Sequence, residues 1–165
     1  KQATDLTKPG PETRKLVAAL GDDFENDIAK LHGLSAAVLE KVAYQTGKTN
    51  AETTAEAAIK TGEGVCQDHS HIFCTAARLL GFPARYVSGY LMMSDRVDQD
   101  ATHAWAEAYV QGLGWVGFDI SNGYSPDERY VRIATGLDYR EASPISGMRY
   151  GAAKEDMIVT LQVQQ

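Results

Sequence analysis

Three residues in the middle of the sequence have the side chains that nucleophilic acyl transfer requires: Cys66, His103 and Asp119. In this chemistry a thiolate attacks a carbonyl carbon, an imidazole protonates the leaving amine, and a carboxylate holds the imidazole tautomer. Each residue alone has an ordinary interpretation, as a buried structural cysteine, a surface histidine and a solvated carboxylate at a strand end. The chemistry therefore depends on the elements that would bring the three together.

Cys66 stands at the predicted start of a helix. Residues 62–65, Gly-Glu-Gly-Val, form a lead-in with two glycines, and a mostly apolar stretch follows as far as Leu80, before Gly81. Unpaired backbone N–H groups and the helix dipole favour an anion at a helix start, and the thiolate is the reactive form of cysteine. A backbone N–H there could also face the oxyanion that forms during attack. Apolar residues cover more than one face of this stretch, which predicts a buried central helix.

His103 and Asp119 are predicted to lie on one face of a β-hairpin. Alternation places His103 and Trp105 on the same face, opposite a face of small alanines. Glycines after residue 110 predict a turn that pairs Val110 with Gly114, and in that register Trp105 lies opposite Asp119. His103 is then the diagonal neighbour of Asp119, with about 7–8 Å between their Cα atoms, which allows a hydrogen bond between the side chains. A slip of one residue would put them on opposite faces.

The order of the predicted elements indicates an α+β fold. Periodic and capped segments predict helices up to Leu80, and alternating segments predict strands after it. Besides the helix that starts at Cys66, helices are expected over residues 11–20, 34–45 and 55–60, and strands over residues 84–92, 103–110, 115–119, 131–134 and 157–163. The polar residues 1–10 are expected to form a loose arm. Strands that follow a run of helices predict an antiparallel sheet, against which the Cys66 helix packs.

Length and composition fit one domain. The chain has 165 residues, and its 44% hydrophobic residues suffice for a sizeable core. The net charge of −6 and the pI near 5.2 argue against nucleic acid and against a membrane surface as partners, because both require a basic face. The chain begins with Lys1 rather than Met. We therefore expect a single domain over residues 1–165, taken from a longer protein with an additional N-terminal region.

Four potential metal ligands cluster in one segment, but their spacing does not suit a closed site. They are Cys66, His69, His71 and Cys74. On a helix His71 is turned by about 140° from Cys66, and Cys74 lies about two turns away from Cys66. We therefore expect no metal and no cofactor. The two cysteines would lie about 12 Å apart along the helix, too far for a disulfide, and two free thiols fit a reducing, cytoplasmic location.

Three segments together resemble the bacterial transglutaminase-like family of cysteine proteases: GEGVCQDHSH, PARYVSGY and THAWAEAYVQGLGWVGFDISNG. The resemblance runs from about residue 44 to residue 139. It implies that Cys66 is the nucleophile, His103 the base and Asp119 the residue that orients the histidine. It also implies a papain-like core, in which a central nucleophile helix packs against an antiparallel sheet.

Two aromatic residues are candidates for contact with a substrate. Tyr44 would stand near the oxyanion, as an aromatic residue ahead of the cysteine motif does in some relatives, or would pack within its helix. Trp105 would line a substrate groove or belong to the core. The sequence departs from the family pattern at His69, where relatives often have an aromatic residue, and at residues 120–121, where Ile-Ser stands in place of Pro-Thr. Both departures are expected to alter the pocket.

The predicted function is cysteine-dependent acyl transfer on a carboxamide or peptide bond, through a thioester. Water as the acceptor gives hydrolysis by a protease or amidase, and an amine gives transamidation of protein glutamine. Both reactions use the same triad, and the groove selects the acceptor through its shape and its exclusion of water. A small chain without a calcium motif favours hydrolysis of a peptide or protein amide. An inactive binding or scaffold domain of the same fold is the alternative from another class, and the sequence does not specify an oligomeric state.

Overall fold

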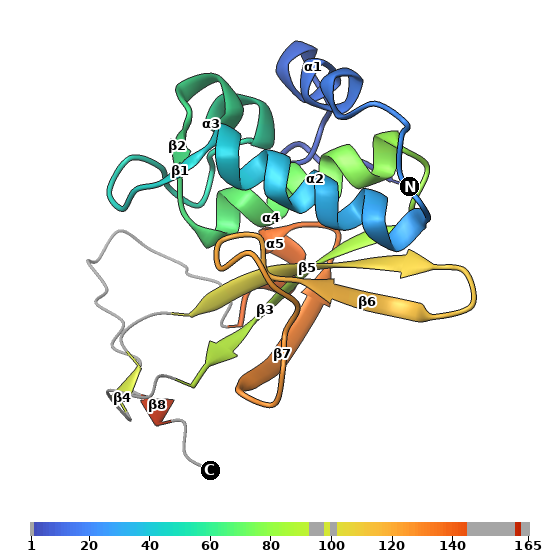
Figure 1. Cartoon of the computed structure of the whole chain (residues 1–165). Helices are drawn as coiled ribbons and strands as arrows, with labels where there is room; N and C mark the ends of the chain where they lie inside the picture. Colours follow the sequence, from blue (N-terminus) through green and yellow to red (C-terminus); the bar gives the residue numbers. More distant parts are fainter. Residues whose placement is uncertain (1, 93–97, 100–101, 145–160, 163–165) are drawn as a thin grey trace.

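The computed structural model describes residues 2–92, 98–99, 102–144 and 161–162 of the chain. Helices cover one face of an antiparallel sheet, and the helix that begins at Cys66 lies between the first three helices and the sheet (Figure 1). The helices are α1 (Pro11–Leu20), α2 (Asp27–Lys41), α3 (Ala55–Thr61), α4 (Cys66–Leu79) and α5 (Tyr139–Ala142). The four-stranded sheet has the order β6 (Gly114–Phe118), β5 (His103–Val110), β3 (Ala84–Leu91) and β7 (Tyr130–Gly136). This arrangement confirms the predicted α+β class.

Two pairs of short strands lie outside the main sheet. They are β1 (Ala43–Tyr44) with β2 (Glu63–Gly64), which run parallel, and β4 (Asp98–Gln99) with β8 (Leu161–Gln162), which run antiparallel. The first pair connects the end of α2 to the segment that leads into Cys66. The strand predicted over residues 157–163 is therefore present at residues 161–162, and its other residues lie outside the described part of the chain.

α4 is central because its sequence is apolar on more than one face. Ile72 and Phe73 are fully buried, and the ring of Phe73 stacks on that of Phe118 with 5.0 Å between their centroids. The helix contacts β5, whose alanines at alternate positions belong to the same core and leave room for a close approach. Burying a side chain such as Phe73 stabilises the fold by about 1.5–3 kcal/mol. The core therefore fixes the position of the helix that carries Cys66.

The hairpin of β5 and β6 has the predicted register. Val110 pairs with Gly114, and Ala106 pairs with Phe118, so that Trp105 and Asp119 are the residues that directly follow the end of this ladder on the two strands. Gly114 has a φ of 85°, in the left-handed region that favours glycine, and this conformation allows the chain to turn at that point.

Two predictions about the N-terminal half are wrong in part. The helix expected over residues 34–45 begins and ends earlier, at Asp27 and Lys41, because Val42 is extended and the backbone after it pairs with β2. Tyr44 is consequently a strand residue. The segment expected as a loose arm contains Leu6 and Thr7, which are both buried. Leu6 packs in the interior, and the Thr7 hydroxyl accepts a hydrogen bond from Arg78 at 2.9 Å, so this segment is tied to α4.

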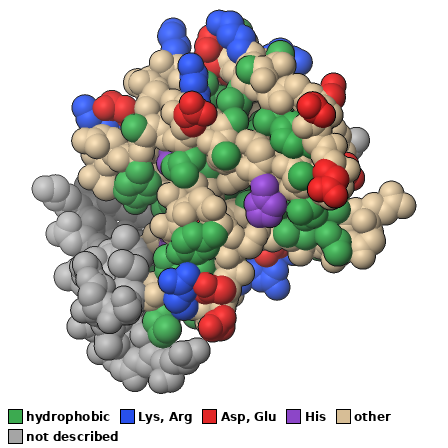
Figure 2. Space-filling view, in the orientation of Figure 1, with side chains coloured by type: hydrophobic (Ala, Val, Ile, Leu, Met, Phe, Trp, Pro, Cys, Tyr) green, Lys and Arg blue, Asp and Glu red, His purple; other side chains and the backbone are tan. Residues whose placement is uncertain are grey.

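The surface of the helical layer carries charges of both signs. Acidic and basic side chains are interspersed there with apolar ones (Figure 2). Among the helices in the described part of the chain, none is long and apolar enough to cross a membrane.

Candidate active site

Cys66 is the first residue of α4 and is partly exposed. Gly62 ends α3 in the left-handed conformation, with a φ of 74°, and so turns the chain toward β2 and the start of α4. The carboxylate of Asp68 accepts the backbone N–H of Val65 at 2.8 Å and the hydroxyl of Thr49 at 2.6 Å. Asp68 therefore has a structural role, because it braces the loop that leads into Cys66 at the helix start.

His103 and Asp119 are joined by a short hydrogen bond. His103 Nε2 lies 2.6 Å from Asp119 Oδ2, and the carboxylate is fully buried. The bond follows from the hairpin register, which puts the two residues diagonally across from each other on one face. The predicted hydrogen bond between His103 and Asp119 is thus present.

The thiol of Cys66 is hydrogen-bonded to the same imidazole ring. Because Asp119 occupies Nε2, Nδ1 is the nitrogen that remains to face the sulfur. Burial alone lowers the pKa of His103, but the hydrogen bonds to Asp119 and Cys66 outweigh it and raise that pKa to about 10. At neutral pH the ring is therefore an imidazolium, and a positive charge beside sulfur favours the thiolate.

Asp119 has two further partners that the sequence did not reveal. Oδ2 also accepts from the Tyr130 hydroxyl at 2.6 Å and from Asn122 Nδ2 at 2.7 Å, and Oδ1 accepts the backbone N–H of Asn122 at 3.2 Å. Burial by itself raises the pKa of Asp119, but the bonds from His103, Tyr130 and Asn122 lower it overall. The carboxylate therefore stays charged in a fully buried position.

A local signal for Asn122 was available in the sequence, but there was none for Tyr130. Asn122 follows Asp119 by three residues, and an aspartate side chain commonly accepts a backbone N–H of the turn that it begins. The backbone N–H of Asp119 donates to the Tyr124 carbonyl at 2.9 Å and closes this turn. Tyr130 comes from β7, which reaches the site only because it pairs with β3.

The two aromatic candidates occupy different places. Tyr44 is 52% exposed. Partial burial raises the pKa of its hydroxyl, and the negative charges of Cys66 and Asp119 nearby raise this pKa further. Trp105 is only 2% exposed and stacks against His103 with 6.3 Å between the ring centroids. Tyr44 thus stands beside the catalytic candidates, and Trp105 lies against the imidazole. Their contact with substrate remains a prediction.

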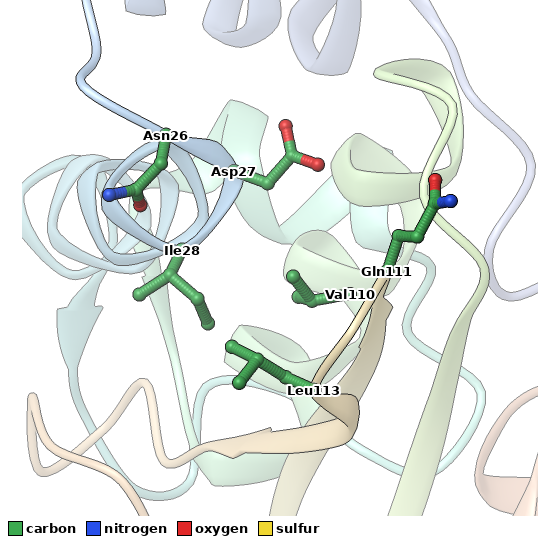
Figure 3. A pocket seen from close by; sticks show the side chains of 6 residues that line it. All are labelled: Asn26, Asp27, Ile28, Val110, Gln111 and Leu113. Carbon is green, nitrogen blue, oxygen red and sulfur yellow. The ribbon is translucent and has the colours of Figure 1, made fainter.

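A pocket of about 580 Å³ lies elsewhere in the molecule (Figure 3). It is lined by the start of α2 and the β5–β6 turn, namely by Asn26, Asp27, Ile28, Val110, Gln111 and Leu113. This lining is at the opposite end of β5 from His103. The pocket is therefore separate from the residues that could perform the chemistry.

Two of the residues considered as metal ligands, His71 and Cys74, lie in the interior. His71 accepts the backbone N–H of Tyr139 at 3.0 Å, and Cys74 is fully buried. Both cysteines are free thiols. Within the described residues, no three histidine, cysteine, aspartate or glutamate side chains are grouped so that they could hold a metal ion.

An α+β core with a cysteine at the start of its central helix, and a histidine and an aspartate on the adjoining hairpin, is the arrangement of the papain-like fold. Residues 14–120 match the model of the transglutaminase-like superfamily. The chain belongs to this family.

The chain is similar to several curated bacterial proteins. The chain is 31% identical to an uncharacterized protein of Mycobacterium leprae over 159 residues, which cover 89% of this chain and 55% of that protein. It is 33% identical to an uncharacterized protein of Mycobacterium tuberculosis, over 78% of this chain and 44% of the relative. It is 27% identical to a protein-glutamine gamma-glutamyltransferase of Pseudomonas aeruginosa, over 80% of this chain and 22% of that protein. The chain thus spans about half the length of the two mycobacterial relatives.

Solved structures show the same fold. A provisionally assigned cysteine protease from Cytophaga hutchinsonii superposes with a TM-score of 0.74 at 27% identity, over 99% of this chain and 55% of that one. Legionella pneumophila LapG superposes with a TM-score of 0.56 at 13% identity, over 78% of this chain and 77% of that one. The second likeness concerns the fold alone.

Proposed function

We propose that this domain catalyses acyl transfer on a carboxamide or peptide bond, with Cys66 as nucleophile, His103 as general acid and base, and Asp119 as the residue that orients His103. The observation that carries the proposal is a continuous chain of hydrogen bonds. The Cys66 thiol is hydrogen-bonded to the His103 ring, and His103 Nε2 lies 2.6 Å from the buried carboxylate of Asp119. Inactive domains of this fold need none of these three side chains.

In the first half of the proposed reaction, the Cys66 sulfur attacks the carbonyl carbon and the carbonyl oxygen becomes an oxyanion. The backbone N–H at the start of α4 is a donor for that oxyanion. The carbon–nitrogen bond then breaks as the His103 imidazolium transfers its proton to the leaving amine. The products of this half are an amine and a thioester on Cys66.

In the second half, an acceptor attacks the thioester and His103 takes up its proton. With water, the carbon–sulfur bond breaks to give a carboxylic acid and the thiolate–imidazolium pair. With an amine, the same steps give a new amide. Hydrolysis is the proposed reaction, and transamidation is the second candidate because one relative is a protein-glutamine gamma-glutamyltransferase.

Trapping the thioester tests this function. The domain would be incubated with casein and a panel of peptides in the presence of hydroxylamine, which converts a thioester into a hydroxamate, and Cys66→Ala would be the control. Hydroxamates on new C-termini would identify peptide-bond cleavage, and hydroxamates on glutamine side chains would identify carboxamide transfer. Neither cleavage nor hydroxamate above the level of Cys66→Ala, with any substrate, would contradict the proposal.

A further inference from the structure

His69 is a fully buried residue of α4, one turn after Cys66, with both ring nitrogens bonded. Nε2 lies 2.9 Å from the carbonyl oxygen of Val42, and Nδ1 lies 2.8 Å from the hydroxyl oxygen of Ser121. Because a carbonyl only accepts, Nε2–H must donate to Val42, and Nδ1 of the neutral ring accepts from Ser121. Burial lowers the pKa of His69, which keeps the ring in this neutral form.

The two bonds lead to the two segments that flank the candidate site. On one side, Val42 directly precedes β1, and the ring of Tyr44 lies edge-on to that of His69, with 6.2 Å between the centroids. On the other side, Ser121 lies in the turn that begins at Asp119. One side chain thus connects the nucleophile helix with the segment of Tyr44 and with the turn of the orienting carboxylate.

The same contact explains two departures noted in the sequence. His69 and Ser121 stand where the family pattern has other residue types, and they are bonded to each other behind the site. Neither bond involves the thiol of Cys66 or the ring of His103. Any influence on the chemistry must therefore act through the positions of the surrounding segments.

We propose that His69 is a positioning residue, which holds the Asp119 turn and the Tyr44 segment in place relative to the helix that carries Cys66. The inference rests on the proposed function. A phenyl ring at this position would fill the same space but could neither donate to Val42 nor accept from Ser121. The site would then keep its packing and lose the two bonds that align its parts.

A double-mutant cycle on Cys66 reactivity tests this role. The rate of alkylation of Cys66 by iodoacetamide at about pH 6.5, roughly two units below the ordinary thiol value, would be followed by mass spectrometry. The variants are His69→Phe, Ser121→Ala, their combination, and Ser121→Thr, which keeps the hydroxyl. His71→Phe is the matched control, because His71 is equally buried in the same helix but bonds to the backbone of Tyr139.

We expect His69→Phe to slow labelling roughly tenfold and Ser121→Ala roughly fivefold, with little further loss when both are combined, because both remove the same bond. Ser121→Thr should restore most of the rate. His71→Phe should lower the melting temperature comparably and change the rate less than about twofold. Equal labelling rates in wild type, His69→Phe and Ser121→Ala would overturn the inference. Effects that multiply in the double variant would also overturn it.

Two further measurements separate this inference from the proposed function. If His103→Ala leaves the labelling rate of Cys66 unchanged, the proposed function fails, and the positioning role fails with it. If His103→Ala slows labelling but the bridge variants do not, only the positioning role fails. Nitrogen-15 spectra of the ring report the bridge independently, since we expect a neutral His69 protonated at Nε2, and a proton at Nδ1 instead would contradict the assigned bonds.

Discussion

The start and the middle of α4 place a cysteine and a histidine in opposite environments. At the N-terminal end, Cys66 is partly exposed and bonded to His103, whose pKa the partners raise to about 10. Further along the helix, burial raises the pKa of the Cys74 thiol to about 12 and lowers that of His71 to about 4. At neutral pH an imidazolium therefore lies beside the sulfur at the start of α4, whereas the middle of the helix carries a neutral thiol and a neutral imidazole.

The difference in charge arises from the hydrogen-bond partners of the two histidines, His103 and His71. The hairpin brings a buried carboxylate to His103, and Asp119 itself is held by Tyr130 and Asn122. Among the described residues, His71 is hydrogen-bonded to the backbone N–H of Tyr139, and its Nδ1 is buried without a hydrogen bond. Asp138 acts on His71 only through its charge, and burial outweighs it, whereas Asp119 is hydrogen-bonded directly to the His103 ring.

The largest expected effect is a difference between the two thiols of the native protein. We predict that iodoacetamide labels Cys66 at least about 1,000-fold faster than Cys74 at neutral pH, because Cys74 is neutral and shielded from solvent. Peptide mass spectrometry after timed quenching measures both rates in one sample. Comparable rates in the folded protein would contradict the contrast, and labelling in denaturant provides the control, because there the two thiols should react alike.

The contact between His103 and Asp119 could be predicted from the sequence, because it depends on a short-range pattern. The alternation after His103 and the glycine turn give the hairpin register, and with it the contact between His103 and Asp119. The bonds from Tyr130 and from His69 could not be predicted, because they depend on which distant strand lies beside β3 and on where α2 ends. The segment of Tyr44 was misplaced because helical periodicity continues past Lys41 although pairing with β2 ends the helix there.

Asp119→Asn should remove most of the difference in reactivity between Cys66 and Cys74. The neutral amide cannot stabilise the imidazolium, and we expect labelling of Cys66 at about pH 6.5 to fall about 100-fold. Asp138→Asn is the matched control, since Asp138 is also buried but caps α5 through the N–H groups of Arg140 and Glu141. An equal fall in both variants would show a general loss of structure instead of a role in the triad.

Tyr130→Phe should weaken the site without removing its charge. The loss of one hydrogen bond to a buried carboxylate should lower the free energy of unfolding by about 2 kcal/mol and make the pKa of Asp119 less depressed. Urea unfolding measures the first effect, with Tyr109→Phe as the control, because that tyrosine is exposed and lies edge-on to Trp115 outside the site. A change no larger than that of Tyr109→Phe would mean that the Tyr130 bond contributes little.

The raised pKa of His103 predicts a smaller, pH-dependent effect on stability. The folded protein binds this proton more tightly than the unfolded chain, whose histidine titrates near 6.5, so the contribution is complete below about pH 6.5 and is lost as the pH rises toward about 10. The difference in unfolding free energy between wild type and His103→Gln should therefore shrink over this range. A difference that is constant or grows with pH would rule out a protonated His103 in the native state.

The central claim is that His103 makes Cys66 a reactive thiolate, and the pH dependence of alkylation in wild type and His103→Ala tests it most directly. We predict rapid labelling of wild-type Cys66 well below the ordinary thiol value of about 8.5, and a loss of this low-pH reactivity by about 100-fold in His103→Ala. Slow labelling with a midpoint near about 8.5 in both proteins would contradict the claim and would leave the domain as an inactive member of its fold.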